Sequence, residues 1–439
     1  MKITIYGSGY IGLVTGVCLA NLGHQVICLD IDKIKINRFS QADSVLYEPE
    51  LSEMLAMNLE QKKISFLHRD DLKQHQSDIV FIAVNIPSSE SEELIFKDMY
   101  SSLDHLLEIS QQDLVIVVRS TVPPQGYSKI KNYILKKLEL LNKSIKVKLL
   151  LNPEFLKEGS AISDFFNPDR IIVGCESKED SAVIKSLYQT FIDKNVPFKV
   201  TTPETAILVK YASNAMLASR IAIMNEFSRL CEVTGGHISE ISELVGMDTR
   251  IGKNYLSAGI GYGGSCFSKD ISMCVNSAEK HGQEMPILKA IEQSNQMQKM
   301  FFIEKINKCK NLFKNKKITL WGCSFKPNTD DIRCSPAIDI IQNFLDLNFA
   351  VNIYDPKAAD SMYKHFSQHQ SIQVFTDKYE SLEQADALVV VTDWDEFREV
   401  DFKRLGQLMM GHYIFDARNI YQHKNLEQMN FIYHPVGIS

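Results

Sequence analysis

The stretch Gly7-Ser8-Gly9-Tyr10-Ile11-Gly12 follows the apolar run of residues 3–6 and opens a helical pattern. In this context glycine allows a tight turn, a close approach of the backbone to a diphosphate, and close packing of the helix on the strand. Asp30 ends the next apolar run, 18 residues beyond Gly12, where a carboxylate accepts hydrogen bonds from ribose hydroxyls and disfavours a 2′-phosphate. The stretch therefore predicts a dinucleotide-binding domain that takes NAD. A glycine turn that only packs a helix on a strand is the alternative, which the presence of the helix and of Asp30 disfavours.

Outward from this motif, short β-branched runs alternate with helical stretches, which indicates parallel strands joined by crossover helices. Strands are expected at residues 3–6, 26–29, 78–84, 114–120, 147–151 and 170–173. From Thr202-Pro203 to Gly235-Gly236 the chain has no further proline or glycine, which predicts one long helix. At about 1.5 Å per residue, this helix is long enough to offer surface for a dimer.

The strand–helix rhythm returns from Lys316, with strands expected at residues 318–322, 351–354, 387–392 and 413–416. The sequence therefore predicts an α/β chain with two Rossmann-like, doubly wound domains joined by a long central helix. We expect an NAD-binding domain at 1–201, a helical linker and dimerisation region at 202–313, and a second α/β domain at 314–439. In that last domain, residues 321–326 lack the second and third glycines, so it should not hold a second dinucleotide in the same way.

Composition bounds the partners. The net charge of −6 is spread along the chain, which disfavours a nucleic-acid partner or an anionic membrane. No apolar run is long enough to span a bilayer and no leader pattern precedes the first strand, so we expect a cytoplasmic protein that does not use a membrane. Nine scattered cysteines without Cys-x-x-Cys spacing predict neither a disulfide scaffold nor a metal site.

The segment Gly259-Ile260-Gly261-Tyr262-Gly263-Gly264-Ser265-Cys266-Phe267-Ser268-Lys269-Asp270 carries a candidate nucleophile. Its glycines allow the backbone to approach a ligand closely and leave Cys266 accessible, while Lys269 favours the thiolate, the form that attacks a carbonyl. A glycine loop with an inert buried thiol is the alternative for such a loop considered alone.

Other candidates gain weight only in combination. Lys210 and Asn214 share one face of the long helix, where a cation and an amide can stabilise an oxyanion. Glu154 and Glu158 follow an expected strand, at the edge where open α/β sheets bind ligands, and suit acid–base work. Thr121 ends another strand at that edge. The alternative for Lys210 and Asn214 is an ordinary solvated helix face. For the two glutamates it is a carboxylate at a helix N-terminus, and for Thr121 it is simple turn chemistry.

In the last domain, the segment Phe325-Lys326-Pro327-Asn328-Thr329-Asp330-Asp331-Ile332-Arg333-Cys334-Ser335-Pro336 joins a strand to a helix and carries two cations suited to diphosphate oxygens. Arg418 ends another strand of the same domain. Ordinary surface cations are the alternative.

Taken in order, these segments resemble the UDP-glucose 6-dehydrogenase family of nucleotide-sugar dehydrogenases over essentially the whole chain. The most specific stretches are residues 152–156, 210–215, 250–252, the Cys266 loop and 325–336. The resemblance implies an N-terminal NAD domain, a homodimer formed through the central helix, and a C-terminal domain that binds the UDP part of UDP-glucose.

The resemblance also implies residue roles. Cys266 would capture the C6 aldehyde as a thiohemiacetal, and a second hydride transfer would give a thioester. Lys210, Asn214 and Asp270 would stabilise oxyanions and help to activate the hydrolytic water, with Glu154 as acid/base and Thr121 holding a water. Cofactor positions of the family fall on the motif residues Gly7, Gly9, Tyr10, Ile11 and Gly12 and on Asp30, Lys35, Thr121, Glu158, Lys269 and Arg333. Substrate positions fall on Glu154, Phe155, Leu156, Lys210, Asn214, Tyr255, Gly263, Phe325, Lys326 and Arg418, and on Arg250, which would reach into the partner's site.

Two positions depart from the family pattern. Ser268 stands where proline usually follows Cys-Phe, so a more mobile loop is expected, and Ile86 stands where a threonine hydroxyl usually meets the cofactor, so weaker NAD binding is expected. Dehydrogenases of GDP-mannose or UDP-N-acetylhexosamines share the mechanism and remain alternatives. A one-step alcohol dehydrogenase and a non-catalytic nucleotide-binding scaffold are the alternatives from other classes.

Overall fold

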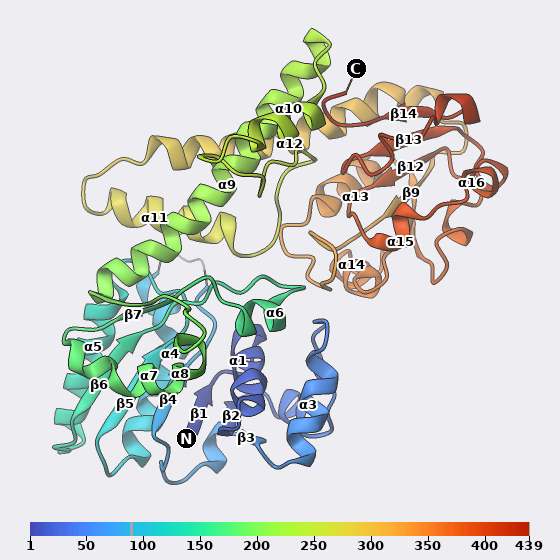
Figure 1. Ribbon diagram of the computed structural model, residues 1–439. Coiled ribbons are helices and arrows are strands. Elements are labelled where there is room, and N and C mark those ends of the chain that lie inside the picture. The colour runs from blue at the N-terminus through green and yellow to red at the C-terminus, as the bar shows by residue number, and fades with distance from the viewer. Residues whose placement is uncertain (88–90, 439) are drawn as a thin grey trace. The chain divides into compact units, whose positions relative to one another are not determined.

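The glycine motif follows β1 (Lys2–Tyr6), an inner strand of an eight-stranded sheet of order β3-β2-β1-β4-β5-β6-β7-β8. The structure is a computed structural model that describes residues 1–87 and 91–438 (Figure 1). Every neighbouring pair in this sheet is parallel except β6 and β7. The other strands are β2 (Gln25–Asp30), β3 (Ile64–His68), β4 (Ile79–Ile82), β5 (Leu114–Val118), β6 (Val147–Leu151), β7 (Ile171–Gly174) and β8 (Phe198–Thr201).

The sheet belongs to the first of two units into which the chain divides, Met1–Ser213 and Asn214–Ser439. Its helices are α1 (Tyr10–Asn21), α2 (Lys33–Ser40), α3 (Leu51–Glu60), α4 (Glu92–Ile109), α5 (Gly126–Leu140), α6 (Ala161–Phe166), α7 (Ala182–Leu187) and α8 (Gln189–Ile192). The chain leaves β1 towards β2 on one side and leaves β4 towards β5 on the other, so right-handed crossovers put α1 and α4 on opposite faces. The sheet order reverses between β1 and β4, the place where doubly wound sheets bind ligands.

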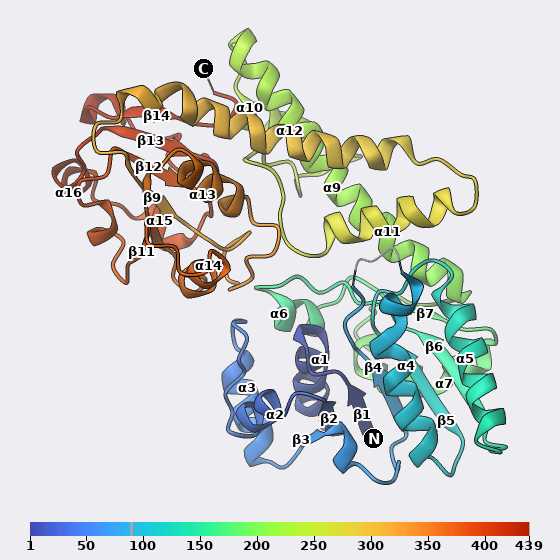
Figure 2. The ribbon, with the colours of Figure 1, turned by 180° about the vertical axis from the view of Figure 1, so that it is seen from behind.

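The second unit contains most of the long helix α9 (Pro203–Thr234), followed by α10 (Ile238–Gly246), α11 (Phe267–Glu279) and α12 (Pro286–Cys309). Figure 2 shows α11 and α12 running side by side. A six-stranded parallel sheet of order β11-β10-β9-β12-β13-β14 completes the unit. Its strands are β9 (Lys317–Trp321), β10 (Ala350–Tyr354), β11 (Ile372–Val374), β12 (Ala387–Val390), β13 (Tyr413–Asp416) and β14 (Ile432–His434), and its helices are α13 (Pro336–Asp346), α14 (Ala359–His365), α15 (Asp395–Arg398) and α16 (Phe402–Leu408).

The expected fold class is confirmed: two doubly wound sheets, in which the order of all six strands of the second matches that of the first six strands of the first, and a 32-residue central helix. Each unit has its own apolar core, with Ile3 and Val14 fully buried in the first and Leu320 and Phe344 fully buried in the second. In the part of the chain that the structure describes, no helix has both the length and the apolar character needed to cross a bilayer.

The two sheets repeat one arrangement with a difference. Gly7 and Gly322 both have a positive φ, of 92° and 97°, after the first strand of their sheets. An aspartate, Asp30 or Asp355, ends or follows the neighbouring strand and accepts a hydrogen bond from the turn. The carboxylate of Asp355 is fully engaged: it also accepts from the indole of Trp394 and from the backbone N–H groups of 324, 357 and 358.

We predict that Gly12→Ala destabilises the first unit by about 3 kcal/mol or more, because a Cβ there would lie 1.8 Å from the carbonyl oxygen of Gly7, and backbone cannot yield cheaply. Urea unfolding followed by circular dichroism measures the effect. Gly9→Ala is the matched control, since nothing lies within 4 Å of its Cβ position and its φ is −69°. A Gly12→Ala protein that unfolds with the Gly9→Ala control would contradict the prediction.

Candidate active site

The three motif glycines differ in how much space surrounds them. A Cβ on Gly7 would lie 2.8 Å from the carbonyl oxygen of Ala83, and one on Gly12 would enter the turn itself. Nothing occupies the space beside Gly9, which stands at the N-cap of α1. The first and third glycines therefore close the turn and pack the helix, while the second leaves its backbone open to a ligand, as a diphosphate requires.

Asp30 lies at the end of β2, beside this turn. One carboxylate oxygen accepts from the N–H of Ser8 at 2.8 Å and the other from the N–H of Asp32 at 3.0 Å. Each oxygen keeps further acceptor capacity for a ribose hydroxyl. Asp32 in turn caps α2, which carries the half-buried Lys35. The donor set and the open turn fit a dinucleotide with an unphosphorylated ribose.

A buried ion pair lies at the carboxyl end of β6. The Nζ of Lys210, on α9, is 2.9 Å from Oε1 of Glu154, and both side chains are 7% exposed. Burial alone would raise the pKa of Glu154, but Lys210, Arg119 and the N–H of Leu156 outweigh it, so the pKa is lowered. Glu154 therefore stands as a carboxylate, a form that accepts protons and orients hydrogen-bond donors.

Buried polar residues that the sequence interpretation did not single out hold this segment in place. Arg119 donates to the side-chain oxygen of Asn152 at 2.6 Å, and Tyr188 donates to the same oxygen at 2.9 Å. The hydroxyl of Tyr211 donates to the carbonyl of Val122 at 3.0 Å, which fixes the start of α9 to the loop after β5. A lone arginine or tyrosine in an apolar stretch has no spacing pattern, so the sequence offered no signal for these contacts.

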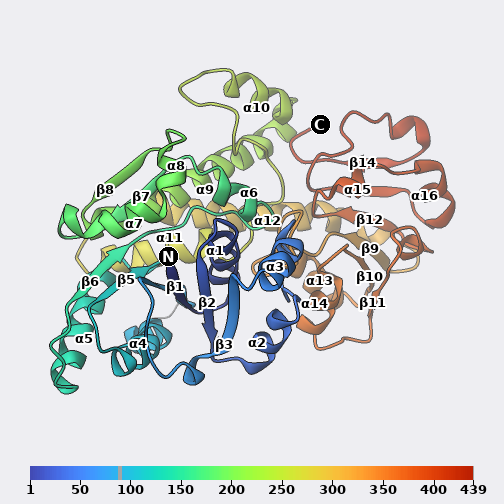
Figure 3. The same cartoon turned by 60° about the horizontal axis from the view of Figure 1, so that its bottom comes forward.

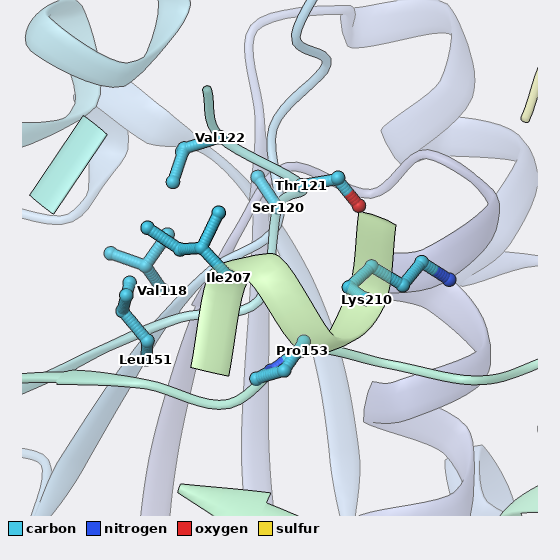
Figure 4. Close-up of a pocket in the computed structure, with 8 residues that line it drawn as sticks. All are labelled: Val118, Ser120, Thr121, Val122, Leu151, Pro153, Ile207 and Lys210. Atoms are coloured by element: carbon cyan, nitrogen blue, oxygen red, sulfur yellow. The ribbon is translucent and has the colours of Figure 1, made fainter. Parts of the chain in front are cut away.

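A small cavity adjoins the pair (Figure 4). Apolar side chains of Val118, Leu151 and Ile207 lie on one side of it, and Thr121 and Lys210 extend on the other. The arrangement brings a hydroxyl and an ammonium to the edge of one apolar hollow. Lys210 therefore shares this cavity with Thr121 and is paired with Glu154, so it links two residues predicted from separate stretches.

In the second unit, Cys266 is the N-cap residue of α11 and is exposed. The carbonyl oxygen of Cys266 accepts from the N–H of Asp270 at 2.9 Å, so the aspartate lies one turn into the helix. Helix N-termini favour anions, so the cysteine stands at the positive end of the helix dipole. None of the nine cysteines forms a disulfide.

Asp270 collects the polar partners next to this cysteine. Its carboxylate accepts from Nδ2 of Asn214 at 2.6 Å and from Nζ of Lys269 at 2.6 Å, and the residue is 2% exposed. The resemblance placed Asn214 and Asp270 in one group with Lys210 and assigned Lys269 to the cofactor, and the structure joins Asn214 and Lys269 to Asp270. Lys210 and Asn214, one turn apart on α9, thus have different carboxylate partners: Glu154 in the first unit and Asp270 in the second.

The glycines of the loop before Cys266 are explained by contacts within the protein. A Cβ on Gly263 would lie 2.5 Å from the carbonyl oxygen of Cys334, and one on Gly264 would meet the ring of Phe325. The N–H of Gly264 donates to the carbonyl of Arg333 at 2.9 Å. The loop is therefore packed tightly against the segment 325–334, and these contacts already require glycine at 263 and 264.

Buried amides on α12 hold the start of the same loop. Asn295 accepts from the N–H of Tyr262 at 2.8 Å and donates to its carbonyl at 3.0 Å, and Gln298 donates to the carbonyl of Gly259 at 2.7 Å. Ser268 is the second residue of α11, a position that needs no intrahelical N–H donor, so serine and proline both suit it. Ile86 is buried, at 4% exposure.

The expected substrate cations differ in their surroundings. Arg418 donates to the carbonyls of Val391 at 2.7 Å and Phe325 at 3.2 Å, which ties the end of β13 to the strand–helix loop. The Nζ of Lys326 lies 5.2 Å from the centre of the Phe325 ring. Arg333 and Arg250 are more exposed and pair with Asp331 at 2.7 Å and Asp248 at 2.6 Å.

Aromatic rings flank the cysteine and the glutamate loop. Tyr255 has a positive φ of 61°, an uncommon conformation for tyrosine, and its ring centre lies 6.4 Å from that of Phe267, the residue after Cys266. Phe155 lies under the guanidinium of Arg170, 4.0 Å from its ring centre. Within residues 1–87 and 91–438, no three His, Cys, Asp or Glu side chains form a group that could hold a metal ion.

Comparisons with known proteins agree with this arrangement. Residues 1–192, 204–297 and 319–423 match the NAD binding, central and UDP binding domains of the UDP-glucose/GDP-mannose dehydrogenase family. The chain is 38% identical to a UDP-glucose 6-dehydrogenase of Rickettsia felis, covering 100% of this chain and 96% of that one, and 37% identical to one of Rhizobium meliloti, covering 100% and 99%.

A solved UDP-glucose dehydrogenase from Pyrobaculum islandicum superposes with a TM-score of 0.89 at 28% identity, covering 100% of this chain and 98% of that one. A UDP-D-ManNAc dehydrogenase from Pyrococcus horikoshii, at 24% identity and a TM-score of 0.85, shares the fold. The resemblance inferred from the motifs is thus confirmed, and the chain belongs to the UDP-glucose/GDP-mannose dehydrogenase family.

Proposed function

We propose that the protein oxidises the C6 hydroxyl of UDP-glucose to the carboxylate of UDP-glucuronate in two NAD-dependent steps, through a covalent intermediate on Cys266. The observation that carries the proposal is an exposed cysteine at a helix N-terminus, with Asp270 one turn away accepting hydrogen bonds from Asn214 and Lys269. The relatives named UDP-glucose 6-dehydrogenase, matched over the whole chain, support the choice of substrate.

The first oxidation turns the alcohol into an aldehyde, with one proton released. NAD, when bound, supplies the acceptor for the hydride in each of the two oxidations. The Glu154 carboxylate, kept ionised by Lys210, suits the role of proton acceptor or of orienting a water, and Thr121, which lines a cavity together with Lys210, would hold that water. The ammonium of Lys210 and the amide of Asn214 stabilise the oxyanion that develops at C6.

The second oxidation requires a covalent bond. The Cys266 sulfur adds to the aldehyde carbon and gives a thiohemiacetal, whose hydride leaves in turn to give a thioester and a second proton. Water then adds to the thioester carbon and the carbon–sulfur bond breaks. The carboxylate product leaves, and the Cys266 thiol is regenerated. Asp270, held by Asn214 and Lys269, orients that water and receives its proton.

We assign the remaining residues to ligands on their chemistry and on the family positions. The cofactor would be held by the motif residues 7–12 and by Asp30, Lys35, Thr121, Glu158, Lys269 and Arg333. The substrate would be held by Glu154, Phe155, Leu156, Lys210, Asn214, Tyr255, Gly263, Phe325, Lys326 and Arg418, with Arg250 reaching in from the partner subunit. The division into 1–201, 202–313 and 314–439 follows the same three roles.

Alternative functions differ in what they release. Two NADH per UDP-glucose consumed are expected for the proposed reaction, one for a simple alcohol dehydrogenase, and none for a nucleotide-binding scaffold. A panel of UDP-glucose, GDP-mannose and UDP-N-acetylglucosamine separates the nucleotide-sugar alternatives.

A cytoplasmic setting agrees with nine cysteines outside any disulfide.

We also propose a homodimer through the central helix. Within the second unit, Met216, Ile223, Phe227 and Leu230 are 66%, 52%, 47% and 52% exposed. Their spacings of seven, four and three residues put them on one stripe of α9, and large apolar side chains in such a stripe are typical of a helix interface.

For the covalent step, we predict that Cys266→Ser still binds NADH and UDP-glucose but loses at least about 1,000-fold in kcat, because the hydroxyl is a far weaker nucleophile than the thiolate. NADH absorbance and product chromatography measure turnover, and calorimetry measures binding. Cys309→Ser, at the end of α12, is the control and should keep wild-type turnover. Undiminished release of UDP-glucuronate by Cys266→Ser would remove the covalent mechanism.

For the buried pair, we predict that Lys210→Met destabilises the first unit by about 3 kcal/mol at pH 7, because it leaves the Glu154 carboxylate buried without its cation. Lys210 lowers the pKa of Glu154, so the pair stabilises the fold above the ordinary carboxyl pKa of 4.5 and loses that contribution as pH falls through the lowered value. The loss on mutation should therefore shrink towards acid pH.

Urea unfolding at pH 7 and pH 4.5 measures this dependence. Lys131→Met is the matched control: its pair with Glu176 is exposed, at 41% and 52%, and its loss should cost less than about 1 kcal/mol. Adding Glu154→Leu to Lys210→Met should restore much of the stability. A Lys210→Met effect that is equal at both pH values would be evidence against the paired charge.

For the dimer, we predict that Phe227→Asp lowers the mass in solution from two chains to one chain of 49.9 kDa, because a carboxylate in the stripe cannot be desolvated there. Light scattering after size-exclusion chromatography gives the mass. Leu140→Asp, 78% exposed at the end of α5, is the control and should leave the mass unchanged. A wild-type protein of one chain at micromolar concentration would rule out the dimer.

A further inference from the structure

A buried carboxylate outside the residues assigned above joins three distant segments of the first unit. Glu48 is 4% exposed and lies between α2 and α3. Its Oε2 accepts hydrogen bonds from the hydroxyl of Tyr10 and from the N–H of Gly159 at 2.6 Å. Its Oε1 accepts from the N–H of Ala161 at 2.7 Å, and the N–H of Ile162 also donates to the carboxylate.

The segments joined in this way are the ones that flank the cofactor-binding turn. Tyr10 opens α1 directly after the open backbone of Gly9. Gly159 and Ala161 follow Glu158, which we assigned to the cofactor. Both α3 and α6 contact α1, and Figure 3 shows the three helices next to one another. Glu48 therefore reaches across the N-terminal end of α1 and fixes the 158–161 segment beside it.

The chain around Glu48 adopts costly conformations to bring the carboxylate there. Val45 has a φ of 61° and Glu50 a φ of 67°, and such values are uncommon for any residue except glycine and are strained for a β-branched one. Strain of this kind persists only where the surrounding contacts outweigh it. The four donors that meet Glu48 are contacts of that strength.

We propose that Glu48 is a positioning residue for NAD: it sets the distance between Tyr10 and the Glu158–Ala161 segment, and thereby the width of the site that receives the dinucleotide. The inference rests on the NAD-dependent function proposed above. The positioning role concerns the binding of the cofactor alone and does not depend on which sugar is oxidised.

The substitution Glu48→Gln keeps the size of the side chain and removes one of its two acceptor oxygens. Four donors require an acceptor with two oxygens, and an amide offers one. With the amide nitrogen in the place of Oε1, two N–H donors face each other at Ala161. With the nitrogen in the place of Oε2, they face each other at Gly159. Either orientation moves the 159–161 segment away from Tyr10.

The test measures NADH binding to the full-length protein by fluorescence and UDP binding by calorimetry. We expect Glu48→Gln to weaken NADH binding at least about 10-fold and to leave UDP binding within about twofold, since the UDP binding domain, residues 319–423, lies in the other unit. The KM for NAD should rise in parallel. Glu53→Gln, an exposed carboxylate on α3, is the matched control and should bind both ligands as the wild type does.

A double-mutant cycle links the effect to Tyr10. Tyr10→Phe removes one of the four donors and should weaken NADH binding less than Glu48→Gln does. Added to Glu48→Gln, it should have little further effect, because the two residues act through one hydrogen bond. Fully additive effects would overturn the proposed coupling.

The remaining outcomes are equally decisive. Unchanged NADH binding in Glu48→Gln, or equal losses of NADH and UDP binding, would overturn the positioning role. If Glu48→Gln gives no soluble protein, Glu48→Asp, which is one methylene shorter, should show the same selective loss, and an equal loss of both ligands would again overturn the role. A wild-type protein that binds UDP but not NADH would overturn the proposed function itself, and this inference with it.

Discussion

The pairing of buried Lys210 with buried Glu154 constrains much of the first unit. Neither charge is tolerable at 7% exposure without the other, so the start of α9 is fixed to the carboxyl end of β6. The same end of the helix is held a second time by the Tyr211 hydroxyl on the loop after β5. The long helix therefore begins at a fixed point beside the cofactor-binding sheet, and the residues one turn later, starting with Asn214, continue from that point into the second unit.

The sequence predicted the inner strands of both sheets and missed the same kind of strand four times. Strands β3, β8, β11 and β14 are the edge strands of their sheets. The residues of β8 are only partly covered, and β11 and β14 have three residues each. An inner parallel strand is covered on both faces and is a continuous apolar run, whereas an edge strand is short and half-exposed and lacks that signal.

The residues of the candidate site also differ in whether the sequence could predict them. Cys266, Asp270, Lys210 and Glu154 were predictable because reactive groups stood in recognisable segments. Glu48, Arg119 and Asn295 were not, because a single buried polar residue has no spacing that announces its partners. Such residues hold the loops through side-chain to backbone hydrogen bonds, and these become visible only when the chain is folded. The glycines before Cys266 predicted a close approach of the backbone, but the sequence did not indicate that Phe325 and Cys334 are among the neighbours that make it necessary.

The matching aspartates of the two sheets, Asp30 and Asp355, differ in how substitution of each would affect the protein. Asp30 keeps acceptor capacity that a visiting molecule can use, so altered chemistry at that position changes which molecule visits. Asp355 is committed to its own backbone and to Trp394, so altered chemistry there breaks the fold before any ligand is involved. A change at Asp30 can therefore alter which cofactor binds while the fold stays intact, whereas the carboxylate of Asp355 serves as an internal strut of its own sheet.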